Sequence, residues 1–260
     1  MTKRREKKTT KPLLAAVVSD LHFPFIHRPT WRAFKQWHAH VKPDITVILG
    51  DFLDFASMSR YPAETGQSQD VVVEIQQFVK EANTLARECG RLVVVGGNHD
   101  EERWYRKIIE PIALQFPGMK GLGLHDQCLA HGLLHSVEWY IEGLHWRGFK
   151  VGNMILRHGH KQGSRFGSTN LTRAALTRTL GQSQMFGHHH RVELTALGTA
   201  TGTRLAVANG HMTTDHGYSL ENNWVRGFTI LEVEPQKGFT HAYPVVIEGG
   251  RFAWGGKLYG

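Results

Sequence analysis

Residues 13–22 read LLAAVVSDLH, residues 45–54 read ITVILGDFLD and residues 92–100 read LVVVGGNHD. Each stretch begins with a short, continuous run of apolar residues and ends in polar ones. Such runs are typical of strands that are buried on both faces of a parallel sheet. Because the carboxyl ends of parallel strands meet at one edge of the sheet, the sequence predicts a cluster of polar side chains at that edge.

Helical patterns fill the two intervals between these strands. Residues 30–41 and 71–89 carry apolar side chains at spacings of three and four, and Gly90 follows the second stretch where a helix-ending glycine belongs. The order strand, helix, strand, helix, strand predicts a parallel sheet with helical crossovers. A further helix is expected at residues 101–116.

The second half of the chain is expected to form mostly antiparallel strands. A Gly-Thr-Ala-Thr-Gly turn at residues 198–202 indicates a hairpin. The predicted strands cover residues 141–146, 149–158, 192–197, 203–208, 228–233 and 241–247, and one helix is expected at residues 168–180.

The composition is that of a globular protein with one core. The chain has 260 residues, of which 41% are hydrophobic, and this suffices for a single domain spanning residues 12–260. No apolar run approaches the roughly 18 residues that cross a bilayer, so no membrane is expected. Cys89 and Cys128 form no C-x-x-C pair, which favours a reducing, cytoplasmic location without disulfides.

The first residues of the chain predict a disordered basic arm. Residues 1–11 hold six cations against Glu6, so they carry five of the eight net positive charges and leave three on the rest of the chain. Such an arm is able to bind the phosphates of a nucleic acid, and it equally suits a solubilising tail. The body alone has too little net charge to predict strong nucleic-acid binding.

Five groups of polar residues with metal-binding side chains follow the ends of predicted strands or short apolar segments. In chain order they are Asp20-Leu21-His22, Gly50-Asp51-Phe52-Leu53-Asp54, Gly97-Asn98-His99-Asp100, His158-Gly159 and Gly187-His188-His189-His190. His188 and His190 stand two residues apart, so on extended backbone they point the same way while His189 points away.

The order D-x-H, G-D-x-x-D, G-N-H-D, H-G and G-H-x-H resembles the five-motif signature of the calcineurin-like metallophosphoesterases. The motifs run from Asp20 to His190, and all five are present. The resemblance implies an α/β fold, a four-layer α/β/β/α sandwich of two mixed β-sheets with a metal site at the carboxyl ends of the strands. It also implies phosphoester hydrolysis by two metal ions that clamp the attacking and leaving oxygens.

The same resemblance implies a role for most polar residues of the motifs. Mixed imidazole, carboxylate and amide ligands suit divalent transition metals better than magnesium. Manganese is the first expectation, and iron, zinc, nickel and cobalt are the alternatives. The expected ligands are Asp20, His22 and His190 for the first ion and Asn98, His158 and His188 for the second, with Asp51 bridging the two.

Two further pairs of residues are expected to act on the substrate. His99 resembles the family's catalytic histidine, a general acid for the leaving oxygen, and Asp54 resembles the carboxylate that orients it. Asp54 also fits a helix N-cap, which is a purely structural role. Lys161 and Arg165 follow the fourth motif and are expected to contact a substrate phosphate.

Departures from the wider superfamily narrow the class of substrate. Protein Ser/Thr phosphatases carry Arg-Gly where this chain has Phe55-Ala56 and Gly96-Gly97, so that branch is excluded. The basic arm favours a phosphodiesterase acting on nucleotides or on nucleic acid, that is, a nuclease on DNA or RNA. The alternatives are a phosphomonoesterase acting on a small phosphorylated molecule and, from another class, a non-catalytic binding module with this fold.

Overall fold

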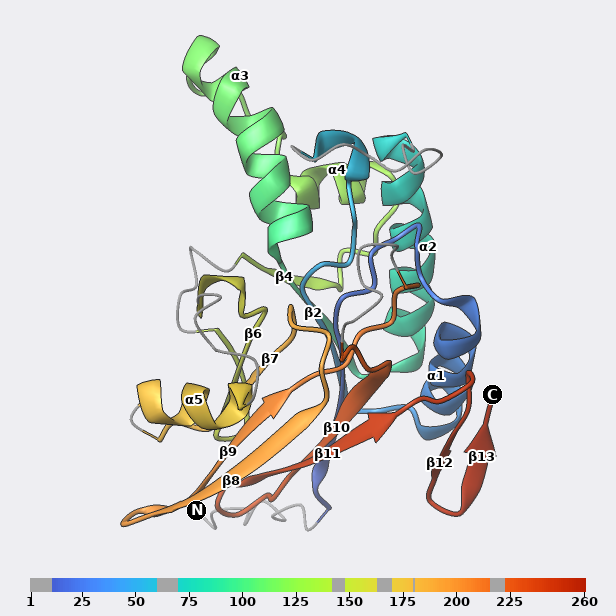
Figure 1. The fold of residues 1–260 in the computed structure, drawn as a ribbon. Helices are drawn as coiled ribbons and strands as arrows, with labels where there is room; N and C mark the ends of the chain where they lie inside the picture. The colour runs from blue at the N-terminus through green and yellow to red at the C-terminus, as the bar shows by residue number, and fades with distance from the viewer. Residues whose placement is uncertain (1–10, 60–69, 142–147, 163–169, 180, 216–222) are drawn as a thin grey trace, which may run out of the picture.

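The computed structural model describes residues 11–59, 70–141, 148–162, 170–179, 181–215 and 223–260. The basic arm up to residue 10 and all but the first residue of the strand expected at 141–146 lie outside these ranges, so both stay predictions. Within the described residues, two sheets are flanked by helices (Figure 1).

The larger sheet has six strands in the order β11-β10-β1-β2-β3-β4. Strands β1 to β4 run parallel, whereas β10 and β11 are added antiparallel at one side. The predicted parallel pairing of the first three strands is confirmed. The bounds are β1 (Leu13–Val18), β2 (Ile45–Leu49), β3 (Arg91–Val95), β4 (Glu138–Tyr140), β10 (Gly227–Val233) and β11 (Thr240–Val246).

Helices α1 (Arg28–Val41) and α2 (Val71–Glu88) are the predicted crossovers, and they lie side by side (Figure 1). The carboxylate of Asp70 begins α2 by accepting a hydrogen bond from Val72 N at 2.8 Å, which satisfies one of the unpaired N–H groups of the first turn. The apolar faces of both helices are buried in one core cluster with alternate residues of β1, β2 and β3. Successive side chains of a strand face opposite ways, so the other half of these residues faces the second sheet.

The second sheet has five strands in the order β5-β6-β7-β9-β8. The expectation of mostly antiparallel pairing is wrong for its centre, because β6, β7 and β9 are parallel and the outer strands β5 and β8 are antiparallel. Helix α5 (Leu171–Arg178) lies between β6 and β7 in the chain and makes the crossover. The bounds are β5 (Phe149–Val151), β6 (Met154–Arg157), β7 (Gln184–Phe186), β8 (Glu193–Thr199) and β9 (Gly202–Ala208).

Three separate apolar clusters place the elements in four layers. One lies between the crossover helices and the six-stranded sheet, and a second lies between the two sheets. In the third, Leu171 and Ala175 of α5 pack on Phe186 and Ala208 at the outer face of the five-stranded sheet. The predicted α/β fold with two mixed sheets is confirmed, and the three clusters fit the predicted α/β/β/α layering.

A long helical stretch begins directly after β3 and projects from the body of the protein (Figure 1). It runs through η2 (Asn98–Glu102), η3 (Tyr105–Ile109) and α3 (Glu110–Gln115), and the first two segments have π-helical turns. It begins three residues before the predicted start, so the G-N-H-D motif forms its first turn. The side chain of Glu101 accepts a hydrogen bond from Trp139 Nε1 at 2.5 Å, which fixes the base of this helix to β4.

The remaining elements are short. Helix α4 (Leu124–Ala130) follows a glycine-rich segment at residues 118–123, and the sequence patterns do not predict this helix. No helix of the described residues is both long and apolar enough to cross a membrane, and Cys89 and Cys128 are free thiols. The other short elements are η1 (Ala56–Met58), η4 (His160–Gln162), β12 (Phe252–Trp254) and β13 (Lys257–Tyr259).

Replacing Glu101 by glutamine should stabilise the protein at alkaline pH and leave it unchanged at acidic pH. Burial raises the pKa of Glu101 to about 7, and the hydrogen bond from Trp139 offsets only part of this. A folded-state pKa above the unfolded value means that the stability is complete at low pH and falls as the pH rises through 7. We expect Glu101→Gln to raise the free energy of unfolding by roughly 1–3 kcal/mol near pH 8.5 and by about zero near pH 4, below the unfolded pKa. Urea unfolding at both pH values measures this, and an equal effect at the two would contradict it.

Candidate active site

The loops that follow the strand ends are joined by backbone hydrogen bonds. Asp20 N donates to Gly50 O at 3.0 Å and His22 N donates to Asp51 O at 2.9 Å, which fixes the loops after β1 and β2 to each other. From the other sheet, His188 N lies 3.1 Å from both carboxylate oxygens of Asp20. The sites predicted on separate strands therefore meet at one edge of the sandwich.

Backbone strain is concentrated at the same place. Non-glycine residues seldom adopt a positive φ, and each such residue costs on the order of 1–3 kcal/mol. Five of the residues predicted to bind metal do so: Asp20, His22, Asp51, His188 and His190, with φ between 47° and 66°. Strain of this kind persists where the surroundings impose it, and it marks functional sites.

Two glycines of the motifs are required by close approach. A Cβ on Gly97 would lie 2.3 Å from Asp51 Oδ1, and a Cβ on Gly187 would lie 2.7 Å from Asp20 Oδ2. Each glycine thus leaves room for a carboxylate that would otherwise be displaced.

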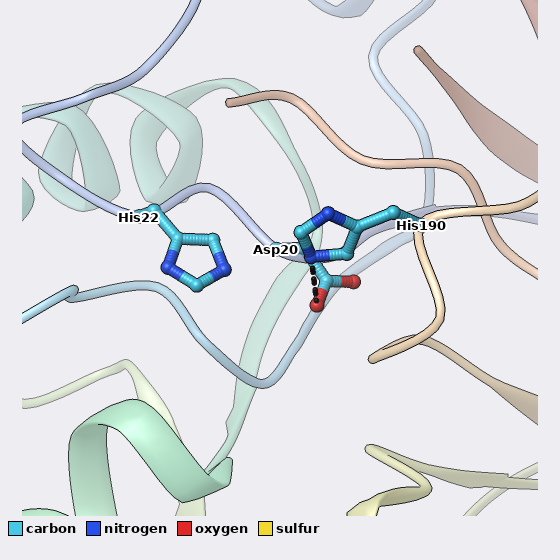
Figure 2. A group of neighbouring side chains, drawn as sticks. All are labelled: Asp20, His22 and His190. Carbon is cyan, nitrogen blue, oxygen red and sulfur yellow. Dashed lines mark ion pairs between the residues drawn. The ribbon is translucent and has the colours of Figure 1, made fainter. Parts of the chain in front are cut away.

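The first cluster contains Asp20, His22 and His190 (Figure 2). One ligand atom of each residue lies within 4.8 Å of those of the other two. His190 Nε2 is 3.2 Å from Asp20 Oδ1, and all three side chains are buried. The loop after β1 supplies the first two residues and the loop after β7 supplies the third.

The second cluster contains Asp51, His158 and His188, again within 4.8 Å. His158 Nε2 lies 3.0 Å from Asp51 Oδ2 and 3.2 Å from the side-chain oxygen of Asn98. The predicted ligands of the second ion are thereby brought together around one imidazole.

Asp51 lies between the two clusters. Its Oδ2, which contacts His158, is also 4.0 Å from His22 Nε2 in the first cluster. Its Oδ1 accepts a hydrogen bond from His99 N at 2.8 Å. A carboxylate in this position is able to offer ligand atoms to both clusters.

A third group joins the predicted acid to the first cluster. Asp54 Oδ1 lies 2.8 Å from His22 Nδ1 and 3.2 Å from His99 Nδ1, so one carboxylate orients both imidazoles. The rings of His22 and His99 meet edge to face at 4.7 Å. The sequence suggested the contact with His99 but gave no sign of the closer contact with His22.

Charge in the site is balanced between carboxylates and imidazoles. Burial alone would lower the pKa of His158, but the negative charge of Asp51 and the hydrogen bond to it raise that pKa to about 10. The pKa of Asp51 is held well below its usual value against the effect of burial, because His158 and His99 lie beside it. Burial and, after it, the charge of His158 together lower the pKa of His188 to about 3.

The donor set fits divalent transition metals. Each cluster offers buried imidazole nitrogen and carboxylate oxygen, the second adds an amide oxygen, and this mixture is the one that such ions prefer. His190 Nδ1 is buried without a hydrogen-bond partner among the described residues. The exposed fraction of the Asp20 and His158 side chains is 0%, so charges here need compensation from a ligand or an opposite charge.

Comparison with known families identifies the class of protein. A sequence model described as calcineurin-like phosphoesterase matches residues 13–192. The chain belongs to this family. Among curated proteins, it is 24% identical to the Gene 54 protein of Mycobacterium phage L5 and 26% identical to the Gene 54 protein of Mycobacterium phage D29. Each match covers 94% of this chain and 97% of the relative.

Solved structures with a similar fold share little sequence with this calcineurin-like phosphoesterase. One is Vps29 from Entamoeba histolytica complexed with Zn²⁺, with a TM-score of 0.48, 19% identity and coverage of 91% of this chain and 94% of that chain. Another is vacuolar protein sorting 29 from Cryptosporidium parvum, with a TM-score of 0.47, 14% identity and coverage of 95% of each chain.

Of the two cations expected to bind substrate, the structure describes only Lys161. Lys161 is exposed on η4, three residues after His158, and Arg165 lies outside the described residues. Their contact with a substrate phosphate stays a prediction. In contrast, His160, on the same turn, lies 3.0 Å from Glu102 Oε2 at the base of the projecting helix.

Two residues to which the sequence assigned no specific role, His211 and Asp100 of the third motif, contribute contacts to the site. The ring of His211 stacks on His190 at 4.8 Å, and burial lowers the pKa of His211 to about 2. Asp100 accepts hydrogen bonds from Gly97 N at 2.5 Å and Phe52 N at 2.9 Å, which ties the second and third motifs together. His211 follows the end of β9, so its place after a strand was the available signal.

Metal binding should release a proton near neutral pH. Without metal, the raised pKa keeps His158 protonated at pH 7, and a metal ligand must lose its proton. We expect Mn²⁺ affinity to fall by about tenfold for each unit of pH lowered below the His158 pKa. Calorimetry in two buffers with different ionisation enthalpies counts the protons, and His158→Asn should release one fewer. Binding without proton release at pH 7 would contradict the pairing of His158 with Asp51.

Proposed function

We propose that this calcineurin-like phosphoesterase hydrolyses phosphodiesters with a binuclear metal centre. The observation that carries the proposal is the position of Asp51, whose Oδ2 is 3.0 Å from His158 in one cluster and 4.0 Å from His22 in the other. A shared carboxylate holds two ions close enough to act on one phosphate. Asp20, His22 and His190 would hold one ion, and Asn98, His158 and His188 the other.

When bound, the two ions would supply the positive charge that polarises the phosphate and acidifies a water molecule. The chain supplies the proton for the leaving oxygen from His99. Asp54 orients its Nδ1 at 3.2 Å, which directs Nε2 away from the carboxylate. Burial alone would lower the pKa of His99, but the charge of Asp51 and the hydrogen bond to Asp54 raise it, so the proton is held until transfer.

The preference for a nucleic acid or nucleotide rests on the basic arm, whose six cations suit a polyanion. A phosphomonoesterase acting on a small molecule is the alternative within the same chemistry. Metal content and turnover of bis-p-nitrophenyl phosphate with added Mn²⁺ test the proposal, and p-nitrophenyl phosphate ranks the two substrates. Two bound metal equivalents with faster turnover of the diester are expected. Bound metal without turnover of either ester would instead indicate a non-catalytic binding module.

Asp51→Asn should abolish turnover and reduce the metal content of both clusters. A neutral amide has one oxygen to offer and no charge, so it is unable to bridge two cations equally. Metal analysis and rate are measured together. Asp126→Asn, at an exposed aspartate outside the clusters, is the matched control and should leave both unchanged. Two full metal equivalents with a near-normal rate in Asp51→Asn would refute the bridging role.

His99→Ala should retain the metals and lose rate by roughly 10²–10⁴-fold, the usual contribution of a general acid. The loss should be smaller for p-nitrophenolate, which leaves without much protonation, than for an alkoxide leaving group. His135→Ala, at an exposed histidine, is the control. An equal loss for good and poor leaving groups would assign His99 to phosphate binding and not to proton donation.

A further inference from the structure

A cleft with a volume of about 550 Å³ opens between α1 and α2, outside the three polar clusters. Its floor is apolar, with Phe23 and Trp31 almost fully buried. This volume lies within the usual range of ligand sites, about 300–1,000 Å³. The cleft is on the helical face of the six-stranded sheet, where α1 and α2 lie side by side (Figure 1).

The rim of the cleft is strongly basic. Arg28, Arg32, Lys35 and Lys80 line it, and Glu81 is the single carboxylate of the lining. Lys35 Nζ donates a hydrogen bond to Glu81 Oε2 at 2.9 Å, so the charge of this carboxylate is already paired with one of the four cations.

The same carboxylate also accepts a hydrogen bond from Trp31 Nε1 at 2.9 Å. Within the described residues, the other three cations of the lining, Arg28, Arg32 and Lys80, have no ion-pair partner. The cleft thus has an excess of three cations, which equals the net charge of the whole body outside the arm.

The cations form a row along α1. Arg28, Arg32 and Lys35 stand at i, i+4 and i+7, which places them on one face of the helix, about 6 Å apart along the axis for the first pair. Lys80 faces them from α2. The row begins at the N-terminus of α1, where the helix dipole adds partial positive charge. The ligand that such a row fits is extended and carries repeated negative charges.

The cleft and the metal clusters share a loop. Phe23, in the cleft floor, follows His22 of the first cluster. Its backbone N–H donates to Phe52 O at 2.9 Å, and its carbonyl accepts at 3.0 Å from the backbone N–H of Asp54, the residue that orients His99. A ligand in the cleft therefore lies against the other side of the loop that positions the first cluster.

We propose that this cleft binds backbone phosphates of a nucleic-acid strand whose scissile bond lies at the metal clusters. Guanidinium groups bind phosphate oxygens in pairs of parallel hydrogen bonds, and such contacts position a strand without reading its sequence. The proposal rests on the proposed function for the chemistry at the clusters, but binding in the cleft is measurable without it. A small phosphomonoester bound at the clusters has no second phosphate group that could reach the row.

The test compares two triple variants of the full chain. In the cleft variant, Arg28→Gln, Arg32→Gln and Lys80→Gln remove the cations that have no ion-pair partner. In the control variant, Lys150→Gln, Arg173→Gln and Lys237→Gln remove the same charge from exposed positions outside the cleft. Anisotropy of a labelled single-stranded oligonucleotide is measured against salt concentration with EDTA, which prevents cleavage.

Loss of three phosphate contacts should weaken binding by about tenfold or more at low salt and flatten the slope of log affinity against log salt by about 2. The control variant should change the affinity and the salt slope by less, and both variants should turn over bis-p-nitrophenyl phosphate as the unaltered protein does.

Equal effects of the two triple variants on oligonucleotide binding would overturn the proposal. Polyglutamate that competes as well as an oligonucleotide of equal charge would overturn it in favour of an acidic protein. If the oligonucleotide binds as expected but the unaltered protein does not turn over bis-p-nitrophenyl phosphate, the proposed function is wrong and the proposal for the cleft stands.

Discussion

The burial of the Asp51 carboxylate is the constraint on which the rest of the structure depends. This side chain is 2% exposed, and a buried carboxylate destabilises a fold unless charges and donors surround it. His158 lies 3.0 Å from one oxygen and His99 N donates to the other at 2.8 Å, while Gly97 leaves the space that the carboxylate fills. The end of β2, the first turn of the projecting helix and the end of β6 must therefore be in place together. The contacts that satisfy this charge also shape the metal centre.

The site also explains why the two sheets are packed back to back. Asp20 and Asp51 follow strands of the six-stranded sheet, whereas His158 and His190 follow strands of the five-stranded sheet. The apolar cluster between the sheets, which includes Val47, sets how closely these strand ends approach. Five of the residues predicted to bind metal have positive φ, and each costs on the order of 1–3 kcal/mol, so the site is a strained region that core packing offsets. Neither sheet alone supplies all residues of the cluster of Asp20, His22 and His190 or of the cluster of Asp51, His158 and His188.

The sequence was most informative where local chemistry and strand order agree. Continuous apolar runs defined β1, β2 and β3, and the polar residues at their ends led to both clusters that the structure brings together. Parallel pairing in the second sheet was missed because β7 has three residues, too few to show a period or a partner. Asp54 contacts His22, and the ring of His211 stacks on His190, across segments that are far apart in the chain. The spacing of residues within a segment does not predict contacts of this kind. Arg165 lies outside the described residues, so its expected contact with a substrate phosphate stays a prediction.

The distribution of charge bears on the size of the substrate. Outside its arm the chain has three net positive charges, and the cleft between α1 and α2 has the same excess, so the rest of the body is close to neutral. A near-neutral body with one basic cleft attracts a polyanion to one face. Because α1 follows β1, the basic row begins near the carboxyl edge of the sheet, whereas the chain enters β1 at the opposite edge. Charges further apart than about 8 Å are largely screened at physiological salt, so the cations of the cleft act mainly on a ligand that lies in it. A small diester bound at the metal clusters is too short to reach these cations, while a strand held in the cleft is presented to the loop that carries His22. The cleft, which the structure describes, is thus a stronger reason for a polymeric substrate than the arm.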